Sequence, residues 1–499
     1  MLAHNQNLNS TSVFWFLPCH PRKVGGVYFF KIICCRYKKY LPLSYSKVLS
    51  NRTSIIKKSK EDHKNKGGSI LVSSHNSKGS KAFGLDRRSV LKGVAASAAV
   101  AGVGGFPAIL KASTGPIKIG VTTINSGRVA ILGETAIAGM NMVVKDVNDA
   151  GGIDGRMLEV VVRDSKGKPD EAARLTRELV NNEGCEILLN AEASGASFAV
   201  NETARDIKKF CIHSVSETSS LTADPKNRVD WVFRCARQGI HDAVGGGIYA
   251  AGVVKEKGLK KWGTCSPDYA YGRANTAEFM EYVKLFSENI ETTVETWPKI
   301  FQPDYTENIT ALLNNQPEAV YTCLWGGDLV AFVDQASLYG LFDQFESFAV
   351  NLSDYPILTA IKQLPKGMNG GSRYHKDIPD TQANEEWYNK FRERNTVLPT
   401  NWSWANDSAM RFIVAALQET GGDTDYMKLA KATQGRTIDS PFGHDGKLTM
   451  RGEDHTLVNY MVAYGKTVPK DPYLIDVVST DWKDIYTHEA DWKKRNNYS

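Results

Sequence analysis

The sequence predicts an α/β protein with two lobes, each built from a parallel-rich sheet covered by helices. Two observations support this prediction. Short β-rich runs alternate with helical patterns over most of residues 117–350, and this order is typical of parallel strands joined by helical crossovers. The alternation also restarts after Arg237, and the length of residues 113–499 suits two domains.

The first series of elements covers residues 117–214. The run IKIGVTT is apolar and β-branched, as expected of a buried strand. Apolar residues then recur at helical spacing until Gly151-Gly152, which ends the helix, and Pro169 opens the next helix. The expected strands are 117–123, 158–163, 186–190 and 210–214, and the expected helices are 133–150, 169–182 and one that starts near 194.

The second series repeats this order and is followed by a different C-terminal third. Residues 442–464 alternate in polarity around Asp445-Gly446, which predicts a hairpin with its turn there. The expected helices are 243–257, 271–289, 305–314, 328–340, 385–394 and 404–419, and the expected strands are 261–265, 290–297, 319–324 and 347–350.

Residues 81–112 resemble a twin-arginine signal peptide. Arg87 and Arg88 precede a mild apolar run rich in Ala and Gly, and this run is too short and too weakly apolar to span a membrane. Val90 stands where an aromatic residue is usual, and Leu110-Lys111-Ala112 is an imperfect cleavage site. We expect an exported, periplasmic protein that begins near residue 113.

Charge divides the chain at the same place. Residues 1–112 hold 19 Lys+Arg and 3 Asp+Glu, whereas residues 113–499 have a net charge of −10. The overall +6 therefore comes from the leader, and it does not indicate a nucleic-acid partner. Residues 1–80 are rich in Lys, Ser and Asn without periodicity, which indicates either disorder or translated sequence upstream of the true start.

Five cysteines follow the leader, and none has the C-x-x-C spacing of a zinc or redox site. Cys185 and Cys211 each begin an expected strand. Two interpretations are therefore open: a disulfide between neighbouring strands, or separate buried thiols, which is the commoner behaviour of free cysteine.

Four segments, in the right order and at the right intervals, resemble the Leu/Ile/Val-type substrate-binding proteins of ABC importers, which have the type I periplasmic binding fold. Residues 117–120 (IKIG) open the chain as in that family. Residues 148–155 match its N-x-x-G-G-I-x-G turn, 158–164 the strand that follows, and 268–272 (DYAYG) its D-x-x-Y-G loop.

The resemblance implies two Rossmann-like lobes joined by a hinge, with the chain crossing between them. We expect residues 113–237 plus about 370–452 in the N-terminal lobe, and residues 238–369 plus about 453–499 in the C-terminal lobe. Ligands of open α/β sheets bind beyond the carboxyl ends of the strands. The loops that follow strands in both lobes are therefore the candidate binding site.

The N-terminal lobe supplies the expected polar contacts. The resemblance implies that Ser194 and Gly195 hold a ligand carboxylate, because a helix N-terminus offers free N–H groups and a positive dipole end. The alternative is that Ser194 only caps its own helix. Ser216 and Glu217 lie in the loop whose oxygens accept from a ligand ammonium group in the family. Glu217 favours a cationic or amide-bearing ligand, unless it is a surface residue.

The C-terminal lobe supplies the expected apolar walls through Tyr269, Tyr271 and Trp325. Asn351 or Asp354 falls near the position of an acidic ligand contact in the family. Asn351 in place of a carboxylate weakens an amine site, which argues against an ordinary branched-chain amino acid.

Other residues near the expected cleft are assigned structural roles. Trp402 and Trp404 are expected in core or hinge packing. Arg128 is expected to be a solvated residue at the rim of the cleft, and the alternative is that it helps to bind an anion. His213 follows a strand beside the expected pocket and is the one histidine of interest.

The expected function is extracytoplasmic solute binding for an ABC importer. The ligand would be an amino acid, an amide or a related carboxylate, and the partners would be the permease and ATPase subunits. We find no dinucleotide fingerprint after a strand, nucleophile elbow, HExxH or P-loop in the sequence, so neither an enzyme nor a cofactor nor a metal is expected. The alternatives are a ligand sensor on the same fold, signalling to a receptor or regulator, and a cytoplasmic enzyme with a spurious leader.

Overall fold

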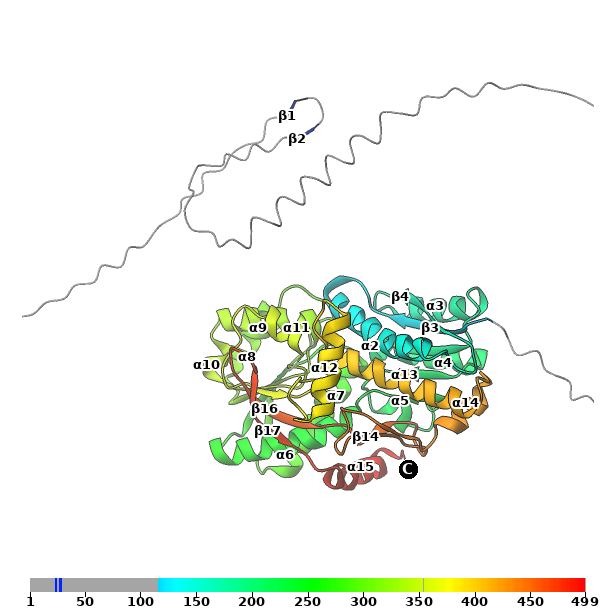
Figure 1. Ribbon diagram of the computed structural model, residues 1–499. Coiled ribbons are helices and arrows are strands. Elements are labelled where there is room, and N and C mark those ends of the chain that lie inside the picture. Colours follow the sequence, from blue (N-terminus) through cyan, green and yellow to red (C-terminus); the bar gives the residue numbers. More distant parts are fainter. Residues whose placement is uncertain (1–22, 25–26, 29–114, 353, 499) are drawn as a thin grey trace, which may run out of the picture. The chain divides into compact units, whose positions relative to one another are not determined.

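The computed structural model describes residues 23–24, 27–28, 115–352 and 354–498 (Figure 1). β1 (Lys23–Val24) and β2 (Val27–Tyr28) form an antiparallel pair in a unit of their own. Arg87, Arg88 and the whole expected leader lie outside the described residues. The description below concerns the second unit, from Gly115 onward.

The first lobe is built on a five-stranded, entirely parallel sheet with the strand order β4-β3-β5-β6-β7. Leu189 packs with residues of α2 and α13, whereas Leu188 packs with residues of α3 and α4. Successive side chains of a strand point to opposite faces, so helices cover both faces of the sheet. The bounds are β3 (Ile117–Thr123), β4 (Leu158–Asp164), β5 (Ile187–Ala191), β6 (Cys211–His213), β7 (Val232–Arg234), α2 (Ala130–Asp149), α3 (Pro169–Asn181), α4 (Ser194–Ile207), α5 (Ser220–Ala223) and α13 (Asn401–Glu419).

The helices α2 and α13 approach each other closely at Gly139. A Cβ atom at this position would lie 2.1 Å from the backbone oxygen of Ser403. A capping box at Thr400 fixes the start of α13: the hydroxyl of Thr400 accepts from the N–H of Trp402, and the hydroxyl of Ser403 accepts from the N–H of Thr400. The first turn of α13 is therefore held in one place beside α2.

The second lobe is built on a seven-stranded sheet with the strand order β17-β16-β12-β11-β10-β8-β9. Strands β8 to β12 pair in parallel, and β16 and β17 extend one edge in antiparallel fashion. Tyr321 packs with α6 and α7, and Val320 packs with α8, α9 and α11 on the other face. The bounds are β8 (Lys261–Cys265), β9 (Glu291–Thr296), β10 (Ala319–Thr322), β11 (Glu346–Ala349), β12 (Asn369–Gly371), β16 (Ala463–Thr467), β17 (Leu474–Ser479), α6 (Gly239–Lys257), α7 (Ala270–Phe286), α8 (Thr306–Asn315), α9 (Gly326–Leu338), α10 (Leu341–Gln344) and α11 (Tyr355–Ala360).

The expected hairpin at residues 442–464 is wrong in part. Asp445-Gly446 does lie in a turn, but the strand before the turn is at 437–439, and residues 463–467 belong to the seven-stranded sheet. Pro441 cannot donate a hydrogen bond to a neighbouring strand. Phe442 is buried in a loop against Trp387, and this buried loop residue gives the sequence the same alternation of polarity as a strand. The remaining elements are β13 (Thr437–Asp439), β14 (Lys447–Met450), β15 (Leu457–Val458), α12 (Gln382–Arg394), α14 (Tyr426–Thr433) and α15 (Trp482–Asn496).

Three segments connect the two lobes. They are the link from β7 to α6, the link from β12 to α12, and the link from β15 to β16. This arrangement confirms the predicted α/β class with two parallel-rich lobes (Figure 1). Lobes connected by a few segments of this kind open and close as rigid bodies about the connections.

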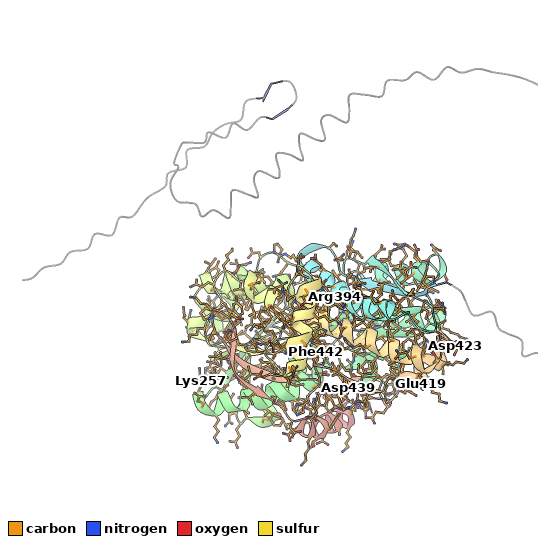
Figure 2. All side chains as sticks on the ribbon, viewed as in Figure 1. Lys257, Arg394, Glu419, Asp423, Asp439 and Phe442 are labelled. Atoms are coloured by element: carbon orange, nitrogen blue, oxygen red, sulfur yellow. The ribbon has the colours of Figure 1, made fainter. Side chains whose placement is uncertain are left out.

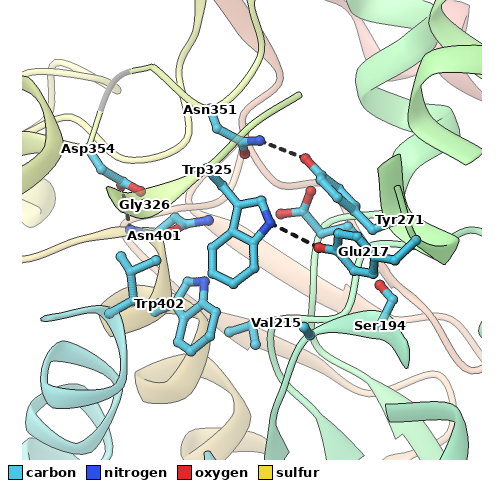
Figure 3. A pocket seen from close by; sticks show the side chains of 13 residues that line it. Ser194, Val215, Glu217, Tyr271, Trp325, Gly326, Asn351, Asp354, Asn401 and Trp402 are labelled. Carbon is cyan, nitrogen blue, oxygen red and sulfur yellow. Dashed lines mark hydrogen bonds between the residues drawn. The ribbon is translucent and has the colours of Figure 1, made fainter. Parts of the chain in front are cut away.

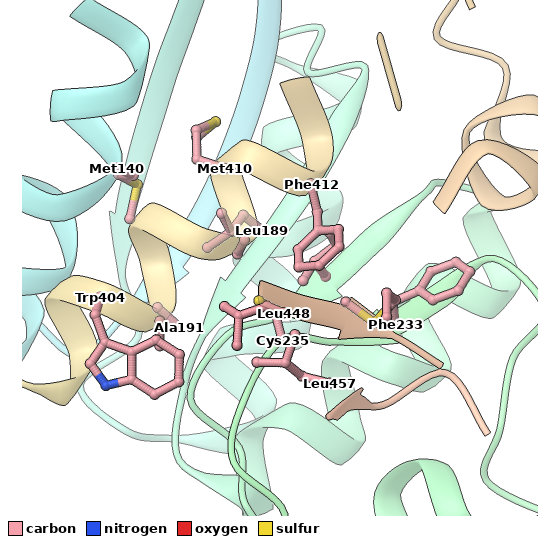
Figure 4. Close-up of a cluster of buried hydrophobic side chains, with 14 of the residues drawn as sticks. Met140, Leu189, Ala191, Phe233, Cys235, Trp404, Met410, Phe412, Leu448 and Leu457 are labelled. Carbon is pink, nitrogen blue, oxygen red and sulfur yellow. The ribbon is translucent and has the colours of Figure 1, made fainter. Parts of the chain in front are cut away.

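The largest hydrophobic cluster of the described residues includes Met140, Leu189, Phe412 and Leu448 of the first lobe (Figure 4) and continues into α6, α7 and α15. Charged side chains such as Lys257 and Glu419 are exposed (Figure 2). No helix among the described residues is both long enough and apolar enough to cross a membrane.

Five cysteines of the described unit are free, buried thiols: Cys185, Cys211, Cys235, Cys265 and Cys323. For Cys185 and Cys211, separate thiols are therefore confirmed in place of a disulfide. Burial raises the pKa of all five thiols above the ordinary value, so they are poor nucleophiles at neutral pH.

Candidate ligand-binding pocket

A pocket lies between the two lobes, at the carboxyl ends of their parallel strands (Figure 3). The empty space in it, including the part that is open to solvent, is about 440 Å³. The first lobe contributes the loops after β5 and β6, the second lobe the loops after β8, β10 and β11, and α13 its first turn. The lining residues are Leu132, Ala193, Ser194, Val215, Glu217, Tyr269, Tyr271, Trp325, Gly326, Asn351, Asp354, Asn401 and Trp402.

Most of the residues expected at the site meet in this one pocket. Ser194, Glu217, Tyr269, Tyr271, Trp325 and Asn351 line it, whereas Gly195 and Ser216 do not. Ser216 is instead fully buried behind the lining, where its hydroxyl donates to Oγ of Ser194 at 3.1 Å.

Ser194 is the first residue of α4, and its hydroxyl faces the pocket end of that helix. Its Oγ accepts from the Ser216 hydroxyl and, at 3.4 Å, from the backbone N–H of Thr218. The cap position belongs to Ala193, without a side-chain hydrogen bond, so the alternative in which Ser194 only caps its helix is wrong. The Ser194 hydroxyl accepts from protein groups, which leaves its own proton for another acceptor.

Aromatic rings form the apolar part of the pocket. The indoles of Trp325 and Trp402 stack with their centroids 5.9 Å apart and an interplanar angle of 25°. The Nε1 of Trp325 donates to the Tyr269 hydroxyl at 2.9 Å, and the rings of Tyr269 and Tyr271 lie 5.8 Å apart. These contacts fix the rings before any ligand arrives, which lowers the entropic cost of binding.

Asn351 lines the pocket and also holds its neighbours in place. Its Nδ2 lies within hydrogen-bond distance of the Tyr271 hydroxyl at 2.7 Å and of the backbone oxygen of Cys323 at 3.0 Å. Because the amide hydrogens are used within the protein, the amide orients Tyr271 and ties the loop after β11 to the loop after β10. The Tyr271 hydroxyl accepts here and keeps its own proton to donate.

Two carboxyl groups line the pocket, those of Glu217 and Asp354. Glu217 is only 7% exposed, so the alternative of a surface glutamate is wrong, and its carboxylate lies between Trp325 and Tyr271 in Figure 3. Asp354 accepts from the backbone N–H of Asn401 at 2.7 Å. Burial raises the pKa of Asp354 to about 7, against the opposing effect of that N–H.

An ion-pair network joins Glu217 to the connections between the lobes. Arg373, just after β12, lies 2.8 Å from Oε2 of Glu217 and 2.7 Å from Oδ2 of Asp242. Asp242 also pairs with Arg237, in the link from β7 to α6, and Arg237 donates to the backbone oxygen of Met461, in the link from β15 to β16, at 2.7 Å. The network therefore touches all three connections.

Burial and charge oppose each other within this network. Burial raises the pKa of Glu217, and Arg373 opposes that rise. Burial would also raise the pKa of Asp242, but Arg237 and Arg373 together hold it below its ordinary value. The positive charge of Arg373 is therefore shared between one carboxylate in the hinge and one in the pocket.

The other singled-out residues have structural environments. His213 is fully buried, and its Nδ1 lies 2.9 Å from Oδ1 of Asn190. Burial lowers its pKa to about 3, and the residue does not line the pocket. Arg128 is outside the pocket and donates to the backbone oxygen of Gln302. Trp404 packs as expected, with Nε1 donating to the backbone oxygen of Arg373.

Trp402, by contrast, lines the pocket instead of packing only in the hinge. The expected helix began at 404, whereas α13 begins at Asn401. The spacing of Thr400 and Ser403 is the sequence signal that would have placed the helix start correctly. With that start, Asn401 and Trp402 fall in the first turn, beside the strand-end loops. In the part of the chain that the structure describes, no three His, Cys, Asp or Glu side chains are grouped so that they could hold a metal ion.

An aromatic pocket between two α/β lobes is typical of a small-molecule binding protein. Residues 116–465 match the family described as "Periplasmic binding protein", and the chain belongs to this family. The resemblance drawn from the four sequence segments is thus confirmed.

Known relatives agree at low sequence identity. A Leu/Ile/Val-binding protein of Citrobacter freundii is 20% identical over 336 residues, which cover 67% of this chain and 88% of the relative. A solute binding protein of an ABC transporter from Rhodopseudomonas palustris BisB5, solved with 3,4-dihydroxy benzoic acid, has a TM-score of 0.65 at 20% identity, covering 74% of this chain and 97% of that one.

A second solved structure is an amino acid ABC transporter substrate-binding protein from Pseudomonas fluorescens Pf-5. It has a TM-score of 0.61 at 18% identity and covers 73% of this chain and 96% of that one. At these identities the two structures establish the type I periplasmic binding fold and leave the ligand open.

Proposed function

We propose that this protein is the extracytoplasmic solute-binding component of an ABC importer. It captures a small amino acid, amide or related carboxylate between the lobes and delivers it to the permease, which works with ATPase subunits. The observation that supports this proposal is a pocket lined by strand-end loops of both lobes. A ligand there touches both lobes only when the cleft is shut, so its binding shifts the population toward the closed form.

The two ends of the pocket suit different ligand groups. The N-terminus of α4, with the Ser194 hydroxyl, suits a carboxylate or amide oxygen because of its free N–H groups and dipole. The carboxyls of Glu217 and Asp354 suit a nitrogen that carries hydrogens. The protein contributes no reactive group in this scheme; it binds, orients and releases.

A ligand screen tests this function. The purified mature chain is heated with amino acids, their amides and aromatic acids, and each compound that raises Tm is measured by calorimetry. Tyr271→Phe removes only the hydroxyl that accepts from Asn351. We expect this change to weaken ligand binding about 3- to 10-fold. Tyr339→Phe is the matched control, since Tyr339 is exposed and outside the pocket. Equal affinities for both variants would place the ligand elsewhere.

Export is tested separately. We propose that the Arg87-Arg88 leader directs the protein to the periplasm. Replacing both arginines by lysine should retain the chain in the cytoplasm, as cell fractionation would show. N-terminal sequencing of the exported form locates the cleavage site, and a periplasmic form that keeps residues 81–112 would contradict the assignment of the leader.

A further inference from the structure

We infer that the ligand carries a net positive charge, with a cationic nitrogen held at Asp354 and Glu217 against the stacked indoles of Trp325 and Trp402. This inference rests on the proposed function and narrows its ligand class. It separates this chain from binding proteins for aromatic carboxylates, with which it shares the fold.

The charged side chains of the pocket and of the ion-pair network behind it indicate the charge of the ligand. Among the thirteen lining residues, Glu217 and Asp354 are the charged ones, and both are acidic. Behind them, Arg373 and Arg237 balance Asp242 and Glu217. Among the described residues, the carboxylate of Asp354 has no ion-pair partner; its hydrogen-bond donor is the backbone N–H of Asn401.

Burial makes this imbalance costly when the cleft is closed. Asp354 is 5% exposed, and an unpaired carboxylate in such a place is strongly disfavoured. The N–H of Asn401 offers it one hydrogen bond at a helix N-terminus, which supplies only a partial charge. An anionic ligand would add to the imbalance and a zwitterion would leave it unchanged, whereas a ligand with one net positive charge removes it.

The aromatic rings fit the same class of ligand. A cation over the face of an indole is attracted by the ring quadrupole, and more so when water is excluded. Trp325 lies between the two acidic side chains in Figure 3, with Trp402 stacked on it. A cation that enters this pocket therefore meets carboxyl groups and an aromatic face in its lining.

In the absence of ligand, a proton on the Asp354 carboxyl neutralises the charge that the cation would otherwise neutralise. Burial raises the pKa of Asp354 to about 7, Glu217 adds to the rise, and Arg373 and Arg237 oppose it. A cationic ligand lowers that pKa again and releases the proton. Proton release on binding is therefore a signature that a purely structural role of Asp354 would not produce.

The test uses probes that differ in charge. Hexanoate is an anion, L-norleucine is a zwitterion without net charge and L-lysine has one net positive charge, and these three share a six-carbon chain. Agmatine, with an amine and a guanidinium on a four-carbon chain, is included as a cation without a carboxylate. We expect L-lysine or agmatine to raise Tm and to bind at least about 10-fold tighter than L-norleucine or hexanoate, in line with a charge pair of more than about 1 kcal/mol.

Asp354→Asn should weaken binding of the cationic probe about 10-fold and abolish the release of a proton on binding. Calorimetry near pH 7 gives the affinity, and a comparison of two buffers with different ionisation enthalpies gives the number of protons released. Asp439→Asn is the matched control, since Asp439 is an exposed carboxylate on the β13–β14 hairpin. Circular dichroism of both variants verifies that they are folded.

The outcomes separate the two proposals. Tighter binding of hexanoate, L-norleucine or 4-hydroxybenzoate than of both cationic probes overturns the charge inference and leaves the solute-binding function standing. Unchanged affinity and proton release in Asp354→Asn also overturn it. If no probe of any charge raises Tm, and native mass spectrometry of the purified protein finds no bound small molecule, both proposals fail.

Discussion

Replacement of Arg373 by methionine tests the role of the buried network most directly. Arg373 is 3% exposed, and its guanidinium pairs with Glu217 and Asp242 while Nε donates to the backbone oxygen of Val350 at 3.1 Å. Methionine keeps much of the volume and removes the charge. Two buried carboxylates then share Arg237 alone.

The expected loss follows from the breaking of a buried pair. Removing one partner of such a pair costs about 3–5 kcal/mol, because the other charge stays buried without compensation. For a described unit of roughly 380 residues, at about 2 cal/mol/K of unfolding entropy per residue, this corresponds to a fall in Tm of roughly 5 °C. Differential scanning calorimetry measures it.

The pH dependence of the loss gives a second check. Burial raises the pKa of Glu217 and Arg373 opposes the rise, so the variant has a folded-state pKa still further above the unfolded value. A carboxyl with a raised folded-state pKa stabilises the fold at low pH and loses that contribution as pH rises. The deficit in the variant should therefore be smaller at about pH 5 than at about pH 8.

Arg174→Met is the matched control. Arg174 also pairs with two carboxylates, Glu171 and Glu178, but its side chain is 57% exposed, so we expect little change. A Tm for Arg373→Met equal to that of the control, or a deficit that does not change with pH, would refute the argument that buried charge governs this network.

Three further predictions concern the pocket, the helix packing and pH. Ser194→Ala should weaken ligand binding by about 1–2 kcal/mol in calorimetry, because it removes the donor at the N-terminus of α4; an unchanged Kd would refute that role. Gly139→Ala should lower stability by about 1–3 kcal/mol through the clash with the backbone of Ser403, whereas Gly252→Ala, with open space around it, should raise it by about 0.5–1 kcal/mol; equal denaturation midpoints would contradict this packing. The affinity for a cationic probe should rise between about pH 6 and about pH 8, as the carboxyl of Asp354, with its pKa of about 7, ionises; a flat calorimetric profile would be inconsistent with it.

Much of the fold is readable in the sequence because long parallel strands and their helices carry strong patterns. The strand predicted at 117–123 matches β3, and Pro169 does open α3. The pattern fails for β12, residues 369–371, whose sequence is Asn-Gly-Gly. Such residues have no β preference of their own, and the neighbours β11 and β16 determine this strand.

The candidate site was predictable where it follows strands and unpredictable where it comes from the hinge. Ser194, Tyr271 and Trp325 follow strands of the two sheets, so topology alone directs them to the cleft. Arg373 belongs to a connection that follows the unpredicted strand β12. Its partner Asp242 is 131 residues away in the sequence, and no local pattern encodes such a pair.

The five buried thiols have a consequence for how this protein matures. No disulfide links the described cysteines, so the described unit needs no oxidant and no disulfide isomerase to reach its final form. The same fold can be completed under the reducing conditions of the cytoplasm and kept under the oxidising conditions outside. A chain with this property would suit the export of already folded protein that we propose for the Arg87-Arg88 leader.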